Sequence, residues 1–269
     1  MKTIPVNFIG YGDWGSRLSQ KVFDEGFCIE NLVTDKTDIS VVHRNLIPRK
    51  NMSNIDWTLP TFITTGPLYH HDILKHCKSR PFVEKPYYIS GQSKTELEFK
   101  PYVNYHWYDS LKSKLIRQFI GNDWDKLNIE LFTTTKIDRG FSVLEDFFPH
   151  VISIIKFLNP NQIKSHKIVK FTNDLYHIEF DYGFNQIIFD VGISNKRYAK
   201  FKTKDILIET SKPTIINFNG SEYTINRDSL TDSIHRYYNY YIGESGDSIF
   251  YSNDFHSFIL KMLDQFYQQ

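Results

Sequence analysis

The chain has 269 residues, a length that favours about two domains. Hydrophobic residues make up 41% and charged residues 23%, an ordinary globular composition that argues against global disorder. With 32 Lys and Arg against 31 Asp and Glu, the net charge of +1 gives no overall basic field for nucleic acid or an anionic membrane.

The first forty residues predict one right-handed βαβ unit. Residues 6–9 are apolar and end at a glycine, which is typical of a buried strand. Apolar residues at helical spacing predict a helix over 16–23, and Gly26 stands where the C-cap of that helix belongs. Residues 29–33 predict the second strand.

The next elements predict a compact parallel sheet. Residues 39–43 are compatible with a strand, although prolines and asparagines leave little room for a helix before position 60. Residues 61–65 and 82–83 predict strands, and 71–78 a short helix between them. Strands that alternate with short helices favour parallel pairing.

Beyond about residue 103 the sequence becomes richer in strands. Residues 128–135 predict a strand, 147–158 an amphipathic helix, 168–225 five or six strands, and 252–266 a closing helix. The 16% aromatic content also favours a broad sheet, because aromatic side chains suit strands and large buried surfaces. We therefore expect an α/β nucleotide-binding domain over 1–104 and an α+β domain over 105–269.

Location and membrane contact can also be predicted. The two cysteines, Cys28 and Cys77, are too few for a disulfide framework and favour a reducing cytoplasm. The apolar segment near the start of the sequence is too short for a signal peptide. No uncharged apolar stretch of 18 residues follows that could span a membrane. We expect a cytoplasmic protein with neither nucleic acid nor membrane as a partner.

A glycine motif stands between the first strand and the first helix. In Gly10-x-Gly12-x-x-Gly15 the first glycine allows a tight turn, the second lets a pyrophosphate approach, and the third lets helix and strand pack closely. Alone it could be an ordinary glycine-rich turn, but Asp35 lies 20 residues further on, where an acid binds the ribose diol and repels a 2′-phosphate. This predicts dinucleotide binding with NAD preferred, while the neighbouring Lys36 keeps NADP open as the alternative.

The tripeptide Glu84-Lys85-Pro86 ends a predicted parallel strand. Ligands bind at the carboxyl ends of such strands, where a partly desolvated Lys85 can act as an acid or base. The plainer interpretation is a surface ion pair before a proline turn.

Asp146 and His150 form a second candidate group. Their four-residue spacing decides nothing, because Asp72 and His76 share it. Pro149, however, suits the first turn of a helix and so predicts that His150 lies at a helix N-terminus. The helix dipole there would disfavour the charged imidazole and leave it ready to accept a proton. The alternative is a buried, hydrogen-bonded histidine.

A metal site is a weaker interpretation of one histidine-rich segment. No second cluster has clear ligand spacing, and the segment suits an ordinary packed helix, so we expect no metal. The segment holds His70, His71, Asp72, His76 and Cys77.

The order of these motifs resembles the glucose–fructose oxidoreductase / inositol dehydrogenase / rhizopine catabolism (Gfo/Idh/MocA) family. The glycine turn is similar to the GxGxWG of its nucleotide-sugar dehydrogenases, and the segment from Asp146 to Ser153 is similar to the D-x-x-P-H-D-I-S-I segment of that branch. Thr65-Gly66-Pro67, followed by His70 or His71, and Glu84-Lys85-Pro86 complete the pattern.

The resemblance implies a Rossmann domain followed by an α/β domain with an open-faced, mostly antiparallel sheet, which often mediates oligomers. It implies catalysis by Lys85, Asp146 and His150. The implied cofactor contacts are Gly10, Gly12, Asp13, Trp14, Gly15, Asp35, Thr65, Gly66, His70, Glu84, Lys85 and Asn104. The implied substrate contacts are Lys85, His106, Asp146 and His150.

The resulting prediction is an NAD(P)-dependent oxidoreductase, cytoplasmic and homo-oligomeric, that acts on a hydroxyl or ketone carbon of a sugar or nucleotide-sugar. Two alternatives use the same fold: a cofactor-binding regulator without catalysis, and an enzyme that uses bound NAD transiently in glycoside cleavage. Net turnover of free cofactor separates the dehydrogenase from both.

Overall fold

The chain folds into two compact units. Of the residues that the structure describes, the first unit holds those up to Tyr105 and those within 230–262, and the second holds those within 106–229. The computed structural model describes residues 3–36, 51–87, 97, 99–121, 124–134, 142–158, 163–210, 213–226, 228–243 and 261–262.

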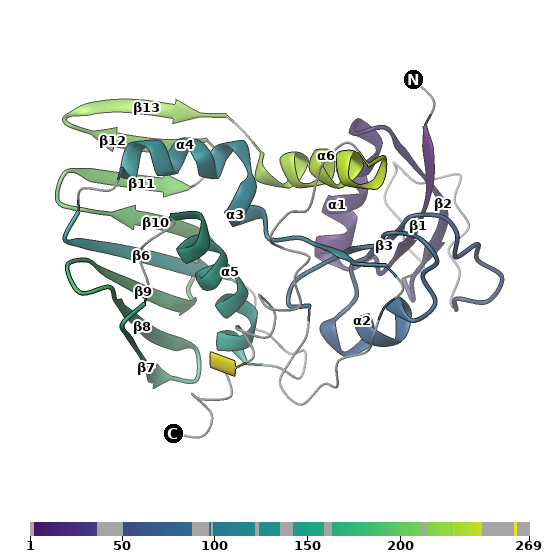
Figure 1. Cartoon of the computed structure of the whole chain (residues 1–269), viewed down its shortest axis with the longest axis horizontal. Helices are drawn as coiled ribbons and strands as arrows, with labels where there is room; N and C mark the ends of the chain where they lie inside the picture. The colour runs from purple at the N-terminus through teal and green to yellow at the C-terminus, as the bar shows by residue number, and fades with distance from the viewer. Residues whose placement is uncertain are drawn as a thin grey trace. The chain divides into compact units, whose positions relative to one another are not determined.

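A five-stranded parallel sheet forms the centre of the first unit (Figure 1). Its strands run in the order β2-β1-β3-β4-β5, and every neighbouring pair is parallel. The order reverses at β1, so the crevice beyond the carboxyl ends of β1 and β3 is the switch point where such sheets bind ligands. The strands are β1 (Ile4–Ile9), β2 (Phe27–Val33), β3 (Thr61–Ile63), β4 (Phe82–Val83) and β5 (Tyr102–Val103).

Local sequence explains the first βαβ unit. Helix α1 (Asp13–Asp24) connects β1 to β2, and Gly26 beyond its C-terminus adopts a φ of +85°, a conformation that favours glycine. The predicted strands at 6–9 and 29–33, the helix and the glycine C-cap are confirmed. Helix α2 (Pro67–Leu74) begins four residues before the predicted 71–78, because Pro67 occupies its first turn.

A helix from the far end of the chain completes this unit. Helix α6 (Ser229–Tyr241) buries Tyr237 completely, and the Tyr237 hydroxyl donates to the Arg80 carbonyl at 2.6 Å. Residues 105–269 were expected to form one domain, whereas the chain returns to the first unit at position 230. Part of the aromatic content therefore belongs to this core, where the Tyr237 ring contacts Phe27, Phe62, Phe82 and Tyr102.

The second unit is built on an eight-stranded sheet in the order β13-β12-β11-β10-β6-β9-β8-β7. Only β6 and β9 pair in parallel, so the predicted mostly antiparallel sheet is confirmed. The strands are β6 (Lys126–Thr133), β7 (Ser165–Thr172), β8 (Leu175–Asp181), β9 (Gln186–Ile193), β10 (Tyr198–Lys202), β11 (Ile206–Thr210), β12 (Thr214–Phe218) and β13 (Ser221–Ile225).

Helices cover one face of this sheet. The helices α3 (His106–Asp109), α4 (Leu111–Ile120) and α5 (Val143–Leu158) pack together, with α5 against β9 and α4 against β11 (Figure 1). In β6 the residues Leu127, Ile129 and Leu131 are buried, while those between them are half-buried. This alternation is typical of an antiparallel sheet with one covered face.

The other face carries a row of charged residues. Glu209, Lys200, Glu130, Asp190 and His177 lie opposite one another on successive strands. The His177 Nδ1 lies 2.7 Å from the Asp190 carboxylate. Burial alone would lower the pKa of His177, but the carboxylates of Asp190 and Glu179 outweigh it and raise the pKa.

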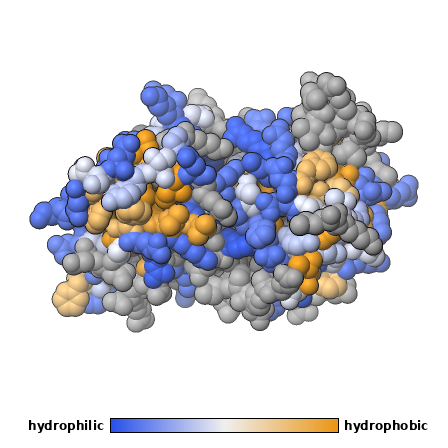
Figure 2. Space-filling view, turned by 90° about the horizontal axis from the view of Figure 1, so that it is seen from above, coloured by the Kyte–Doolittle hydropathy of each residue, from blue (hydrophilic) through white to orange (hydrophobic). Residues whose placement is uncertain are grey.

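Two predicted elements cannot be compared with the structure. The strand at 39–43 lies outside the described residues, and so does the helix at 252–266 apart from 261–262, which are helical. Among the described helices, none is both long and apolar enough to cross a bilayer. Figure 2 shows one face of the molecule, where hydrophilic side chains surround the hydrophobic groups.

Candidate nucleotide site and the α5 histidine

The carboxyl edge of the parallel sheet gathers most of the residues predicted to hold a cofactor. Gly10 follows β1, Asp35 follows β2, Thr65 follows β3, Glu84 follows β4 and Asn104 follows β5. Backbone bonds between neighbouring strands hold these ends in register, including Glu84 N to the Ile63 carbonyl and Asn104 N to the Val83 carbonyl, both at 2.9 Å. One edge thus presents all five strand ends to a ligand.

The three positions of the glycine motif are occupied by glycine for different physical reasons. A side chain at Gly10 would place its Cβ 2.7 Å from the Thr65 nitrogen, and Gly10 has a φ of +97°. A Cβ at Gly15 would lie 2.6 Å from the Gly10 carbonyl oxygen. A Cβ at Gly12 would meet no atom of the described residues within 4 Å. Gly10 and Gly15 are therefore required by the fold, whereas Gly12 leaves space over the turn that a ligand can fill.

Helix α1 begins at this open turn. Gly12 is its N-cap and has no side chain with which to cap the first N–H groups of the helix. Free N–H groups at a helix N-terminus and the helix dipole together favour a phosphate. The turn, the open space over Gly12 and the helix N-terminus therefore fit the pyrophosphate of a dinucleotide.

The loop after β3 adds a second uncapped helix N-terminus. Gly66 is the N-cap of α2 without a side-chain cap, and the Thr65 hydroxyl is buried with no hydrogen-bond partner among the described residues. His70 lies behind this loop, 1% exposed, and its Nε2 donates to the Thr65 carbonyl at 3.0 Å. Burial lowers the pKa of His70 to about 4, so the ring is neutral and supports the loop from within the protein.

The end of β2 carries both an acid and a base. Asp35 is exposed there, and so is Lys36, whose Nζ lies 3.6 Å from the Asp13 carboxylate of α1. Asp13 is 90% exposed, so this ion pair is weak and leaves the ammonium free to move. Asp35 suits a ribose diol, and Lys36 suits a phosphate on the same ribose.

Glu84 is buried in a polar network, with 4% of its surface exposed. The Asn104 amide donates to its Oε1 at 2.6 Å. Burial raises the pKa of Glu84 to about 7, opposed by hydrogen bonding from Trp14 and Asn104 and by the charge of Lys85. Lys85 itself is half-buried, directly after Glu84. The carboxyl group is therefore held close to its titration point at neutral pH.

The structure corrects the placement of His150. Helix α5 begins at Val143, not at Phe147, so Pro149 lies inside the helix and His150 is in its second turn. The reason is a capping box: the Ser142 hydroxyl accepts from the Glu145 N–H at 3.2 Å, and the Glu145 carboxylate accepts from the Ser142 N–H at 2.6 Å. The predicted helix-dipole effect on His150 was therefore wrong, and Asp146 is the residue in the first turn.

His150 nevertheless lies beside a second predicted substrate residue. It is 6% exposed, and its ring centre is 5.0 Å from that of His106 on α3, in an edge-to-face arrangement. Asp146 is half-buried one turn earlier on the same helix. The second unit thus brings together His106, Asp146 and His150, while Lys85 belongs to the first unit.

The histidine-rich segment divides among separate structural roles. Asp72 accepts from Lys75 at 3.0 Å, the His76 ring stacks on Trp57, and Cys77 is buried, which raises the pKa of its thiol to about 12. In the part of the chain that the structure describes, no group of three His, Cys, Asp or Glu residues is arranged to hold a metal ion.

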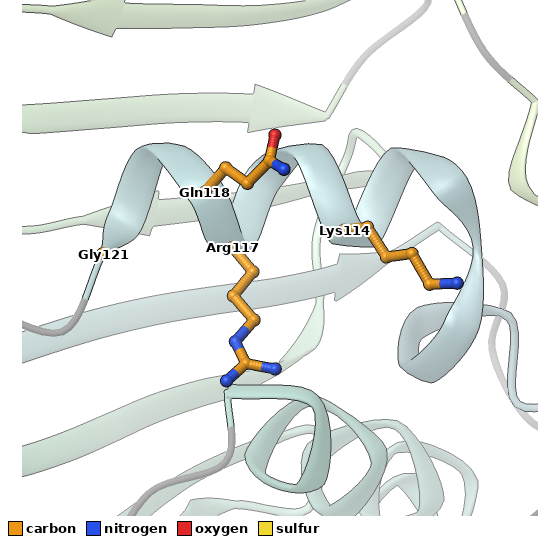
Figure 3. A pocket seen from close by; sticks show the side chains of 4 residues that line it. All are labelled: Lys114, Arg117, Gln118 and Gly121. Carbon is orange, nitrogen blue, oxygen red and sulfur yellow. The ribbon is translucent and has the colours of Figure 1, made fainter.

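A surface pocket of about 540 Å³ lies on helix α4, and its lining includes none of the predicted site residues. Its lining residues are Lys114, Arg117, Gln118 and Gly121. Figure 3 shows the Arg117 and Gln118 side chains pointing in opposite directions, so they do not converge on one ligand group.

Comparison with known proteins places the whole chain on a known fold. No protein-family model matches it, and no curated protein matches its sequence. Solved structures match over nearly the full length, among them a UDP-N-acetylglucosamine 3-dehydrogenase from Acidithiobacillus ferrooxidans, with 12% identity, a TM-score of 0.69, and coverage of 98% of this chain and 97% of that chain.

Two further similar structures contain NADP. A 3-ketoreductase from Actinomadura kijaniata, solved with TDP-benzene and NADP, has 10% identity and a TM-score of 0.69 over 98% of this chain and 96% of that chain. A biliverdin reductase from Synechocystis, solved with biliverdin and NADP+, has 11% identity and a TM-score of 0.67 over 98% of each chain. At these identities the likeness confirms the predicted fold: a Rossmann-type unit followed by a unit with a mostly antiparallel sheet.

Proposed function

We propose that the chain is an NAD(P)-dependent oxidoreductase that acts on a hydroxyl or ketone carbon of a sugar or nucleotide-sugar. The observation that carries the proposal is the turn at Gly12, where the protein leaves open space in front of an uncapped helix N-terminus. The fold alone needs Gly10 and Gly15 but gives no reason for a glycine between them. A dinucleotide pyrophosphate supplies that reason.

The residues at the sheet edge fit the rest of a dinucleotide. Asp35 would bind the ribose diol of the adenosine, while the loop at Thr65 and Gly66 would line the path towards the nicotinamide, which Glu84 and Lys85 would border. When bound, the nicotinamide supplies the hydride acceptor or donor. NAD is the preferred cofactor because of Asp35, and Lys36 makes NADP the second choice.

Four residues would serve the substrate at its reacting carbon. Lys85 would hydrogen-bond the substrate oxygen and stabilise the negative charge that develops on it. His150 would exchange the hydroxyl proton, with Asp146 one helical turn away to orient the group, and His106 would contact the substrate. Positioning two reactants and supplying one proton acceptor are the main contributions of the protein.

The substrate class rests on two supports. One is the motif order around Asp146 and His150, which resembles the nucleotide-sugar branch of the Gfo/Idh/MocA family. The other is the likeness to a UDP-N-acetylglucosamine 3-dehydrogenase and to a 3-ketoreductase solved with TDP-benzene. The equally similar biliverdin reductase shows that the fold also serves other substrates, so a panel of nucleotide-sugars is the first choice to test.

Calorimetric titration of NADH into the protein and two glycine variants tests the proposal. Gly12→Ser introduces a good N-cap into open space, so its free energy of unfolding should stay constant or rise by roughly a few tenths of a kcal/mol. The new side chain would occupy the pyrophosphate position, and NADH affinity should fall ~10-fold or more.

Gly15→Ala is the matched control in the same turn. Its Cβ meets the Gly10 carbonyl, so it should lower the free energy of unfolding by ~1–3 kcal/mol. Wild-type protein that binds neither NADH nor NADPH would contradict the proposed function, and a Gly12→Ser variant that binds NADH normally would move the site away from this turn.

A further inference from the structure

A buried chain of hydrogen bonds joins the nucleotide edge to helix α6. The Asn104 amide donates to Glu84 at 2.6 Å, and the Ser233 hydroxyl donates to the Asn104 Oδ1 at 2.7 Å. The Tyr102 hydroxyl lies 3.1 Å from the Ser233 oxygen. Asn104 and Ser233 are fully buried, and 129 residues separate them along the chain. The whole network belongs to the first unit.

The direction of each bond follows from the number of hydrogens available. The Glu84 carboxylate can only accept, so Asn104 presents its amide nitrogen there and its oxygen to Ser233. The single hydroxyl hydrogen of Ser233 is used on that oxygen, so the Tyr102 hydroxyl donates to Ser233. Every donor therefore points towards Glu84, and each bond polarises the next in the same sense.

Such a chain favours the ionised form of the carboxyl group. Burial opposes that form. Among the described residues, the groups that act on Glu84 are Trp14, Asn104 and Lys85, of which Lys85 carries the only charge. Removal of the Ser233 hydroxyl would leave the buried Asn104 oxygen without its donor and free the amide from its position. The bond to Glu84 would weaken as a result.

We propose that Ser233 is a positioning residue of the nucleotide site, which holds Asn104 so that its amide favours the ionised form of the buried Glu84 carboxyl group beside Lys85. Helix α6, far from the glycine motif in the sequence, is then part of the cofactor machinery. The role of Glu84 towards the nucleotide rests on the proposed function, whereas its link to Ser233 does not.

The charge of Glu84 has a consequence for the redox state of the cofactor. The oxidised nicotinamide ring carries a positive charge and the reduced ring is neutral. A carboxylate that borders the ring attracts the oxidised form alone, so the affinity for NAD+ relative to NADH should rise as Glu84 ionises. Ser233 would set the pH at which this change occurs.

The experiment measures Glu84 directly, in the full chain, by carbon-13 NMR titration of its carboxyl group, with Glu84→Gln used to assign the signal. The wild-type midpoint should lie at about 7. Ser233→Ala should raise it by roughly half a unit, because one polarising bond is lost. Ser233→Thr restores the hydroxyl and should return the midpoint towards the wild-type value.

Ser19→Ala is the matched control, because Ser19 is also a fully buried helical serine of the first unit. It should leave the Glu84 midpoint unchanged. A Ser233→Ala variant that is folded and titrates like the wild type would overturn the proposal, and so would an equal shift in Ser19→Ala.

Calorimetric affinities for NAD+ and NADH, measured from about pH 6 to 8.5, give the second readout. In the wild type the preference for NAD+ should increase ~3-fold or more across this range, with the midpoint moved upward in Ser233→Ala and the change abolished in Glu84→Gln. A pH-independent preference in the wild type would overturn the redox consequence. If neither nucleotide binds, the proposed function fails, while the NMR titration still decides the link between Ser233 and Glu84.

Discussion

The two units carry their candidate chemistry in different ways. In the first, the residues stand on loops at the ends of parallel strands, and the geometry of the sheet brings them to one edge. In the second, His150 and Asp146 project from a long helix that covers a sheet, beside His106 of a neighbouring short helix. A strand end can be located from a few residues, but a helical residue can be placed only when the start of its helix is known.

The largest effect should come from the first unit. Lys85→Met keeps the length of the side chain but removes the donor and the charge that would stabilise the substrate oxygen. We expect a loss of ~10³-fold or more in kcat, with little change in NAD affinity, because the pyrophosphate and adenosine ribose are held elsewhere. The rate of single-turnover hydride transfer at saturating substrate measures this loss. A variant with the wild-type rate would contradict a catalytic role for Lys85 and leave Glu84-Lys85-Pro86 as a structural turn.

The corresponding change in the second unit is His150→Asn. If the buried imidazole exchanges the substrate proton, kcat should fall ~10²–10⁴-fold while cofactor affinity stays nearly constant. Steady-state kinetics together with calorimetric NADH titration separate the two quantities. Unaltered turnover would show that His150 has only a structural role and that catalysis depends on residues of the first unit.

The sequence predicted the two units unequally. Gly10, Gly12, Gly15 and Asp35 were placed correctly because strand, turn and helix follow one another within a few residues. The predicted helix at 147–158 begins four residues later than the observed α5, which starts at Val143. The capping box of Ser142 and Glu145 is a sequence signal that marks the observed start. The late predicted start moved His150 to a helix end where it does not lie.

Contacts between residues far apart in the sequence could not be predicted from local sequence patterns. Ser233 and Tyr102 meet across 131 residues, and no spacing rule connects them. Helix α6 has apolar residues at helical spacing, Leu230, Ile234 and Tyr237, but only the tertiary structure shows that they pack on the first unit. The predicted homo-oligomer through the eight-stranded sheet stays a prediction.

A smaller effect concerns cofactor choice at the end of β2. Asp35→Ala removes the acceptor for the ribose diol and the repulsion of a 2′-phosphate, leaving Lys36 as the charged neighbour. NAD affinity should fall ~10-fold and the gap to NADP should narrow. Parallel calorimetric titrations measure both affinities, and a wild-type preference for NADP would contradict the role given to Asp35.

The smallest effect lies on the charged row of the second unit. The pKa of folded His177 is raised, so its ion pairs contribute stability that is fully present below the unfolded pKa and is lost as pH rises through the folded value. Relative to His177→Gln, the wild type should be more stable by about 0.5–1 kcal/mol near pH 6, with less difference near pH 9. Denaturant unfolding tests this, and a difference that grows with pH would contradict the sign.

One measurement tests the central claim most directly: a crystal structure of the chain grown with NADH. The account predicts one dinucleotide per chain, with its pyrophosphate over Gly12 at the N-terminus of α1, its adenosine ribose at Asp35, and its nicotinamide beside Glu84 and Lys85. The same crystal structure would also give the distance from the nicotinamide to His150. A nucleotide bound away from the carboxyl edge of β1 and β3, or a clearly defined Gly12 turn without nucleotide at saturating NADH, would contradict the account.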